Sequence, residues 1–233
     1  MGELTTVGDL PAYRASPAGE GPWPGLLLVH ELFGLDDEMV RHADTLAAMG
    51  YLVVAPDLLA RGRRVVCLAQ TMTALRTGRG RVFDDLEAGR TALLADPACN
   101  GSVGVIGFCM GGGFALVLAG RPGWDAVAAN YGSLPHDLAA LDGACPVVAS
   151  YGGRDLYLRG AASTLETALA ERGVEHDVKV YPEAGHAFLN ETANAPWYIA
   201  PMSRLVMRAG PEPVSARDAW ARIEEFLGQH LTK

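Results

Sequence analysis

The segment Gly107-Phe108-Cys109-Met110-Gly111-Gly112-Gly113 is the most informative part of this chain. An apolar run over residues 102–106 precedes it and another over residues 114–119 follows it, which predicts a strand, a tight turn and a helix. The turn has the pattern Gly-x-nucleophile-x-Gly, in which small flanking residues let strand and helix approach closely. Cys109 occupies the central position, where serine is usual. We expect it to stand exposed at a helix N-terminus, where free amide groups and the helix dipole favour a thiolate.

Two other interpretations of this turn are open. In the first, Cys109 is only a small buried residue, as free cysteines often are. In the second, the glycines bind a nucleotide phosphate. The segment has no Gly-x-Gly-x-x-Gly order and no lysine to meet a phosphate. A nucleophilic role is favoured over both.

Apolar runs alternate along the chain with segments of helical periodicity. Most of the apolar runs are continuous, which indicates strands covered on both faces, as in a parallel sheet. A chain of 233 residues, 49% of them hydrophobic, is expected to form a single α/β domain over residues 1–233. The predicted strands cover residues 25–30, 51–55, 103–107, 126–131, 146–151 and 178–181, and the predicted helices residues 36–49, 83–95, 112–119, 161–172 and 216–230.

The overall composition restricts the partners. No apolar run approaches the ~20 residues of a membrane-spanning helix, and no basic start with an apolar segment opens the chain. The net charge of −8 argues against binding to nucleic acid or to anionic membrane. We therefore expect a cytoplasmic protein, a monomer or small homo-oligomer, with a small-molecule substrate. No cluster has metal-ligand spacing such as H-E-x-x-H, so neither a metal nor a cofactor is expected.

Arginines are concentrated between Leu58 and Phe83, where six of them occur without an acidic residue. One interpretation is a solvated basic loop, because clustered charge usually lies on the surface. The other is an electropositive rim for a carboxylate-bearing ligand, since a guanidinium binds a carboxylate with two hydrogen bonds.

The segment 190–213 is irregular, with four prolines among several large apolar side chains. So apolar a segment does not suit a solvated linker. We expect a lid-like insertion that covers a site, with Trp197 binding substrate, or else a subunit contact.

Two strand exits supply partners for Cys109. Asp155 follows the strand over residues 146–151, and His186 follows the strand over residues 178–181. Functional groups of an open α/β sheet gather at the carboxyl ends of its strands. The order along the chain is nucleophile, acid and base, which is the order of the α/β-hydrolases. The predicted fold is accordingly an α/β-hydrolase fold, a mostly parallel central sheet with helices on both faces.

The residue types suit nucleophilic catalysis. His186 would accept the thiol proton and later pass it to the leaving group, while Asp155 would orient the imidazole. Taken singly, Asp155 also fits a turn aspartate and His186 a surface-loop histidine. Three such residues in this order favour a triad. Four other histidines lie in predicted helices or loops or at the start of a strand, and we expect them to be structural: His42, His136, His176 and His230.

The first strand exit reads His30-Glu31-Leu32-Phe33-Gly34, where α/β-hydrolases place half of an oxyanion hole. The backbone N–H groups of Leu32 and Met110 are expected to face the tetrahedral intermediate. Phe33 is expected to bind substrate. Glu31 is either a carboxylate that holds the thiol neutral until substrate arrives or a solvated loop acid.

The chain resembles the dienelactone hydrolases, the cysteine-dependent branch of the α/β-hydrolases, over nearly its whole length. The resemblance rests on the residues at 30–34, 50–58, 107–112, 152–155 and 181–188. It implies a cofactor-free hydrolase of an ester or lactone that works through Cys109, His186, Asp155 and an acyl-enzyme. It also implies that Glu31 holds the resting thiol until a substrate carboxylate displaces it. The alternatives are a general carboxylesterase or thioesterase, and a carboxylate-binding homologue without turnover.

Two departures from the family concern the substrate. Members that act on dienelactones bind the carboxylate of the substrate with two arginines, one of them shortly after the catalytic histidine. Here no arginine follows His186 before Arg204. The resemblance places the other arginine after Asp57, with three candidates, and the insertion at 190–213 reshapes the pocket. The candidates are Arg76, Arg79 and Arg81.

Overall fold

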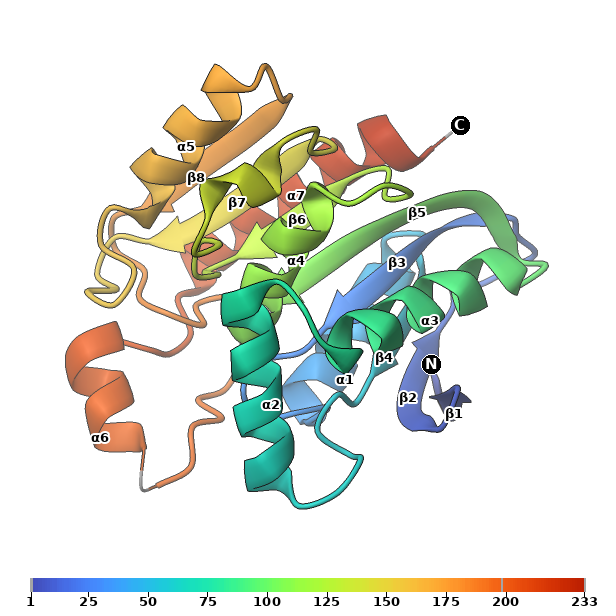
Figure 1. Cartoon of the computed structure of the whole chain (residues 1–233), viewed down its shortest axis with the longest axis horizontal. Helices are drawn as coiled ribbons and strands as arrows, with labels where there is room; N and C mark the ends of the chain where they lie inside the picture. Colours follow the sequence, from blue (N-terminus) through green and yellow to red (C-terminus); the bar gives the residue numbers. More distant parts are fainter. Residues whose placement is uncertain (1, 198, 233) are drawn as a thin grey trace.

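The computed structural model describes residues 2–197 and 199–232, which form an eight-stranded sheet with helices on both faces (Figure 1). The strand order is β1-β2-β4-β3-β5-β6-β7-β8. Strands β3 to β8 are parallel, and β1 and β2 form an antiparallel hairpin at one edge. The strands are β1 (Glu3–Val7), β2 (Leu10–Ala15), β3 (Trp23–Val29), β4 (Leu52–Pro56), β5 (Cys99–Phe108), β6 (Val127–Asn130), β7 (Val147–Gly152) and β8 (His176–Tyr181).

The helices form two layers around this sheet. α1 (Asp37–Ala48) and α7 (Pro213–Leu231) cover one face. α3 (Arg81–Ala95), α4 (Met110–Ala119) and α5 (Ala161–Glu171) cover the other face, and α2 (Arg64–Thr77) packs against α3 and α4 (Figure 1). Successive β3 side chains enter opposite layers, because side chains alternate along a strand. This explains the continuous apolar runs of the central strands.

The strand order places a topological switch point between β3 and β5. The chain goes from β3 to β4 on one side and then crosses to β5 on the other side of β3. Ligands of open α/β sheets bind at the carboxyl ends of the strands that flank such a point. Those two ends carry Glu31 and Cys109.

The predicted α/β class, with a mostly parallel sheet and helices on both faces, is confirmed, and each predicted strand and helix is present within a few residues of its expected bounds. The prediction missed the β1–β2 hairpin and α2. The basic region after Leu58 is therefore not a loop as a whole, since α2 occupies much of it. The buried positions of α2 are few and include small or polar residues, which gave weak periodicity: Cys67, Thr71, Ala74 and Leu75.

The segment 190–213 contains a short helix, α6 (Ala200–Met202), and a π-helical turn, η2 (Ser203–Met207). Its start is bonded to α1, where the buried Glu38 carboxylate accepts hydrogen bonds from the amides of Glu191 and Thr192, each at 3.0 Å. In residues 2–197 and 199–232, no helix is both long and apolar enough to cross a membrane. Nor does that part of the chain contain a group of three or more His, Cys, Asp or Glu side chains suited to a metal ion.

Candidate active site

Cys109 lies at the turn between β5 and α4 with a φ of 54° and a ψ of −114°. A positive φ is uncommon for a residue with a side chain and often marks a functional site. The glycines around it allow this turn, since a Cβ atom on Gly107 would overlap the Gly111 carbonyl, and one on Gly111 would overlap that of Val29. The half-buried Cys109 is thus held at the carboxyl end of the sheet, as the sequence pattern predicts.

His186 and Asp155 form a buried pair. Nδ1 of His186 lies 2.6 Å from Oδ2 of Asp155, and the two residues are 4% and 2% exposed. An ionised carboxylate can only accept, so Nδ1–H donates to Asp155. The amide of Tyr157 donates to the other oxygen of Asp155 at 3.0 Å. The carboxylate therefore has a fixed orientation.

The second nitrogen of His186, Nε2, is left for Cys109. It has no hydrogen-bond partner in the described part of the chain. Burial opposes protonation of His186, but the charge of neighbouring Cys109 and the bond to Asp155 outweigh it and raise the pKa of His186 to about 10. This arrangement favours the protonated form of His186. Hydrogen bonds of catalytic groups often tighten only when substrate binds.

A cavity of about 370 Å³ opens beside these residues. It brings together Cys109, His186 and all four residues predicted from the first strand exit and the nucleophile turn, namely Glu31, Leu32, Phe33 and Met110. Asp155 lies behind His186. The segment 190–213 also contributes to the cavity wall, through Asn194, Ala195, Ile199, Ser203, Val206 and Met207.

Trp197 lies outside this cavity. Its side chain is 85% exposed, and it is not among the residues that the structure places on the cavity wall. The binding of substrate by Trp197 therefore stays a prediction that the lining of this cavity does not support. Two residues close to Trp197 in the segment 190–213, Ala195 and Ile199, line the cavity instead.

The three candidate arginines also lie elsewhere. Arg79 and Arg81 line a separate hollow beside α2, and Arg81 is 3.6 Å from the Asp9 carboxylate. Arg76 is exposed and is not among the residues that line the cavity, although its neighbour Leu75 is. None of the three is among the residues that line the Cys109 cavity, and their binding of a substrate carboxylate stays a prediction.

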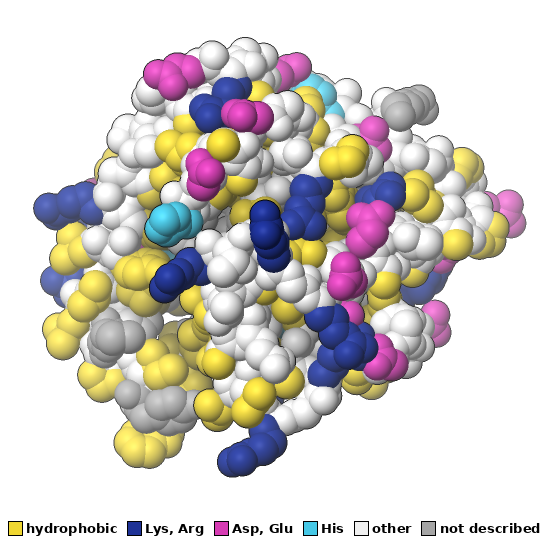
Figure 2. Space-filling view, in the orientation of Figure 1, with side chains coloured by type: hydrophobic (Ala, Val, Ile, Leu, Met, Phe, Trp, Pro, Cys, Tyr) yellow, Lys and Arg dark blue, Asp and Glu magenta, His cyan; other side chains and the backbone are white. Residues whose placement is uncertain are grey.

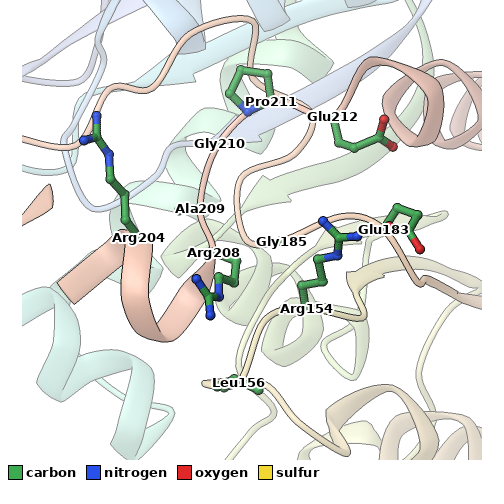
Figure 3. Close-up of a pocket in the computed structure, with 10 residues that line it drawn as sticks. All are labelled: Arg154, Leu156, Glu183, Gly185, Arg204, Arg208, Ala209, Gly210, Pro211 and Glu212. Carbon is green, nitrogen blue, oxygen red and sulfur yellow. Dashed lines mark hydrogen bonds and ion pairs between the residues drawn. The ribbon is translucent and has the colours of Figure 1, made fainter. Parts of the chain in front are cut away.

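Arg204, the first arginine after His186, lines a hollow of about 730 Å³ on the outer side of η2 (Figure 3). Arg208 and Arg154 line the same hollow, and Arg154 pairs with Glu183. Figure 3 shows the guanidinium groups of Arg204 and Arg208 pointing in different directions. Neither arginine lines the Cys109 cavity, whose η2 residues are Ser203, Val206 and Met207.

Glu31 is bonded to two asparagines that the sequence did not single out. Nδ2 of Asn190 donates to both carboxylate oxygens at 3.3 and 3.2 Å, and Nδ2 of Asn194 donates to one of them at 2.9 Å. Burial raises the pKa of Glu31, although these asparagines and His186 act in the opposite direction. No hydrogen bond joins Glu31 to Cys109 among the described residues. Glu31 therefore links the first strand exit to the insertion.

Two histidines support this arrangement. His30 is buried, donates from Nδ1 to the Glu31 carbonyl at 2.6 Å and accepts the Leu58 amide at Nε2 at 3.0 Å. It fixes the backbone that carries Leu32. His42, predicted to be structural, lies 2.9 Å from the Asn190 side-chain oxygen through Nε2 and stacks on a phenylalanine of β5.

The sequence also gave no signal for Tyr131. Its ring is buried on the cavity wall 5.0 Å from the ring of His186, and its backbone has a φ of 41°. Its hydroxyl makes no hydrogen bond to a described residue. Burial, followed by the charges of Glu31 and Cys109, raises the pKa of Tyr131 well above its usual value, so the hydroxyl stays neutral and can donate to a ligand.

His42 should make the protein less stable in acid. Burial lowers the pKa of His42 from 6.5 to about 4. As the pH falls, His42 is therefore protonated in the unfolded chain before it is protonated in the folded protein. The contribution of neutral His42 to the free energy of unfolding is fully present above pH 6.5. About 3 kcal/mol of it is lost as the pH falls towards 4. Urea unfolding at pH 7.5 and 4.5 should show this loss in the wild type. The variant His42→Gln retains an N–H donor for Asn190, and its free energy of unfolding should fall less between these two pH values than that of the wild type. An equal loss in both proteins would contradict the assignment.

Comparisons with known proteins agree with this architecture. The sequence profile of the dienelactone hydrolase family matches residues 10–231. A "Putative carboxymethylenebutenolidase" of Methylorubrum extorquens is 33% identical over 241 aligned positions, which cover 96% of this chain and 78% of that protein. A protein of the same name in Salmonella typhimurium is 30% identical, with 95% and 83% covered. The crystal structure of a "Putative Dienelactone Hydrolase" of Klebsiella pneumoniae has a TM-score of 0.80 at 25% identity, with 98% of each chain covered.

Proposed function

The chain belongs to the dienelactone hydrolase family, and from this premise we propose that it hydrolyses a carboxylic ester or lactone with Cys109 as the nucleophile. His186 is the general base and acid, and Asp155 orients it. The observation that carries the proposal is the buried His186–Asp155 pair, 2.6 Å apart, whose free nitrogen adjoins Cys109 at the cavity.

In the first half of the reaction, the Cys109 thiolate attacks the carbonyl carbon and a carbon–sulfur bond forms. The carbonyl oxygen becomes negative, and the backbone N–H groups of Leu32 and Met110 are proposed to stabilise it. The first amides of a helix have no intrahelical partner, which leaves that of Met110 available. The bond to the alcohol oxygen then breaks, and His186 gives this oxygen its proton.

In the second half, water attacks the acyl thioester. His186 removes a proton from the water, the tetrahedral intermediate collapses, and the Cys109 thiolate leaves as the acid is released. Tyr131 lines the cavity, and we propose that its hydroxyl binds a substrate oxygen. Glu31 and its two asparagines hold the insertion over the site.

A general carboxylesterase or thioesterase would use the same residues. Hydrolysis rates for an enol-lactone, an aryl acetate and an acyl thioester, compared side by side, separate these activities. A carboxylate-binding homologue without turnover is less well supported, because among the described residues no lysine or arginine lines the cavity and His186 is already paired with Asp155.

Alkylation of Cys109 tests the proposed nucleophile. Limiting iodoacetamide near neutral pH should label Cys109 first, since a thiolate is the reactive species. The other three cysteines are internal controls, and burial raises the pKa of Cys145 to about 12. Peptide mapping should show that loss of 4-nitrophenyl acetate hydrolysis follows labelling of Cys109. Hydrolysis that continues after complete labelling of Cys109 would refute this role.

A further inference from the structure

The cavity beside Cys109 is apolar and has no lysine or arginine on its wall among the described residues. His186 is its cationic group, and its charge is already opposed by Asp155 and Cys109. Glu31 adds a carboxylate to the same wall. The apolar lining comes from four parts of the chain: Leu32, Phe33, Met72, Leu75, Met110, Ile199, Val206 and Met207.

Four arginines close in sequence to these walls line other hollows of the surface. Arg64 donates to the Phe33 carbonyl from an adjoining hollow. Arg204 and Arg208 face the hollow on the outer side of η2 (Figure 3). Arg79 faces the hollow beside α2. A carboxylate inside the cavity would therefore lose its water without gaining an ion pair.

The entrance to the cavity is apolar as well. Met72 of α2 and Val206 of η2 line the cavity and are 40% and 41% exposed. Figure 2 shows hydrophobic side chains gathered over α6, beside a hollow in the surface. An uncharged acyl chain would find apolar contacts from the entrance to Cys109.

We propose that this site, if it acts as the hydrolase described above, takes esters with a neutral, apolar acyl portion and rejects acyl portions that carry a carboxylate. Burial of an ionised carboxylate without a partner is costly. The apolar walls, by contrast, gain from contact with hydrocarbon. The selectivity arises from charge rather than from size.

Two esters of matched shape test this inference. In 4-nitrophenyl hydrogen adipate the acyl chain ends in a carboxylate, and in 4-nitrophenyl 6-methylheptanoate it ends in an isopropyl group of similar outline. Release of 4-nitrophenolate gives kcat/KM for both. The neutral ester should be favoured by about 100-fold or more.

A variant that adds a cation provides the converse test. Met72→Arg places a guanidinium at the half-exposed entrance and should raise kcat/KM for the hydrogen adipate by about 10-fold, an increase that salt weakens. Met72→Gln changes the same side chain without adding charge and should not raise it.

The outcomes separate the two proposals. Equal hydrolysis of both esters by the wild type, or a preference for the hydrogen adipate, overturns the inference and leaves the hydrolase function intact. Absence of hydrolysis of both esters overturns the hydrolase function and the inference with it. A strong preference for the neutral ester, partly relieved by Met72→Arg alone, supports both.

Discussion

Replacing Cys109 with alanine is expected to lower kcat/KM for 4-nitrophenyl esters by about 10⁴-fold or more, because no acyl-enzyme can form. The turn itself should persist. Its positive φ of 54° is already borne by a residue with a Cβ atom, and its packing depends on the glycines around Cys109. Thermal unfolding of the variant should therefore resemble that of the wild type. The lower kcat/KM would then result from the missing nucleophile and not from unfolding of the protein.

Cys145→Ala is the matched control for this experiment. Cys145 is also a free cysteine, but it follows the short helix η1 (Leu138–Leu141), and its amide bonds to the end of α4. Its replacement should leave ester hydrolysis near the wild-type rate. Hydrolysis that survives Cys109→Ala, in protein free of wild-type enzyme, would assign the reaction to another nucleophile.

Replacing Asp155 with asparagine is expected to lower kcat by about 10³- to 10⁴-fold. The asparagine amide can donate to Nδ1 of His186 and so favour the tautomer with its proton on Nε2, towards Cys109. His186 would then no longer accept the thiol proton. The change should appear in kcat more than in KM, because Asp155 lies behind His186 and does not line the cavity.

The pH dependence of alkylation distinguishes this role from a structural one. The bond to Asp155 is one of the causes that raise the pKa of His186 to about 10, so its loss should lower that pKa. The imidazolium then loses its proton at lower pH and stabilises the Cys109 thiolate less. Alkylation by iodoacetamide at pH 5 to 7 should therefore slow in Asp155→Asn. Asp142→Asn removes an exposed carboxylate that pairs with Arg172 and should leave the profile unchanged.

The predictable part of the site lies at strand ends. Cys109, Asp155 and His186 each follow an apolar run, and the carboxyl ends of parallel strands share one edge of the sheet. Recognising the strands was thus enough to expect these side chains together. The hairpin β1–β2 was missed because its edge strand β1 is largely exposed, and helix α2 was missed because it is half-exposed and has weak apolar periodicity.

The contacts of Glu31 could not be predicted in the same way. Its hydrogen bond with Asn190 joins residues 159 positions apart, and the bond from His42 to Asn190 spans 148 positions. Neither asparagine belongs to a motif. The contacts of Asn190 and Asn194 with Glu31 depend on the path of the segment 190–213 over the first strand exit.

The amino-acid sequence by itself determined the α/β-hydrolase fold, the family and the proposed nucleophile, acid and base, because each follows from local patterns and strand order. Only the tertiary structure decided what else surrounds Cys109. It places Leu75 and Met72 on the cavity wall, and it places Arg79 and Arg204 on the walls of other hollows. The direction of a side chain depends on how its helix or turn packs against the rest of the fold, and residue order along the chain does not specify that packing.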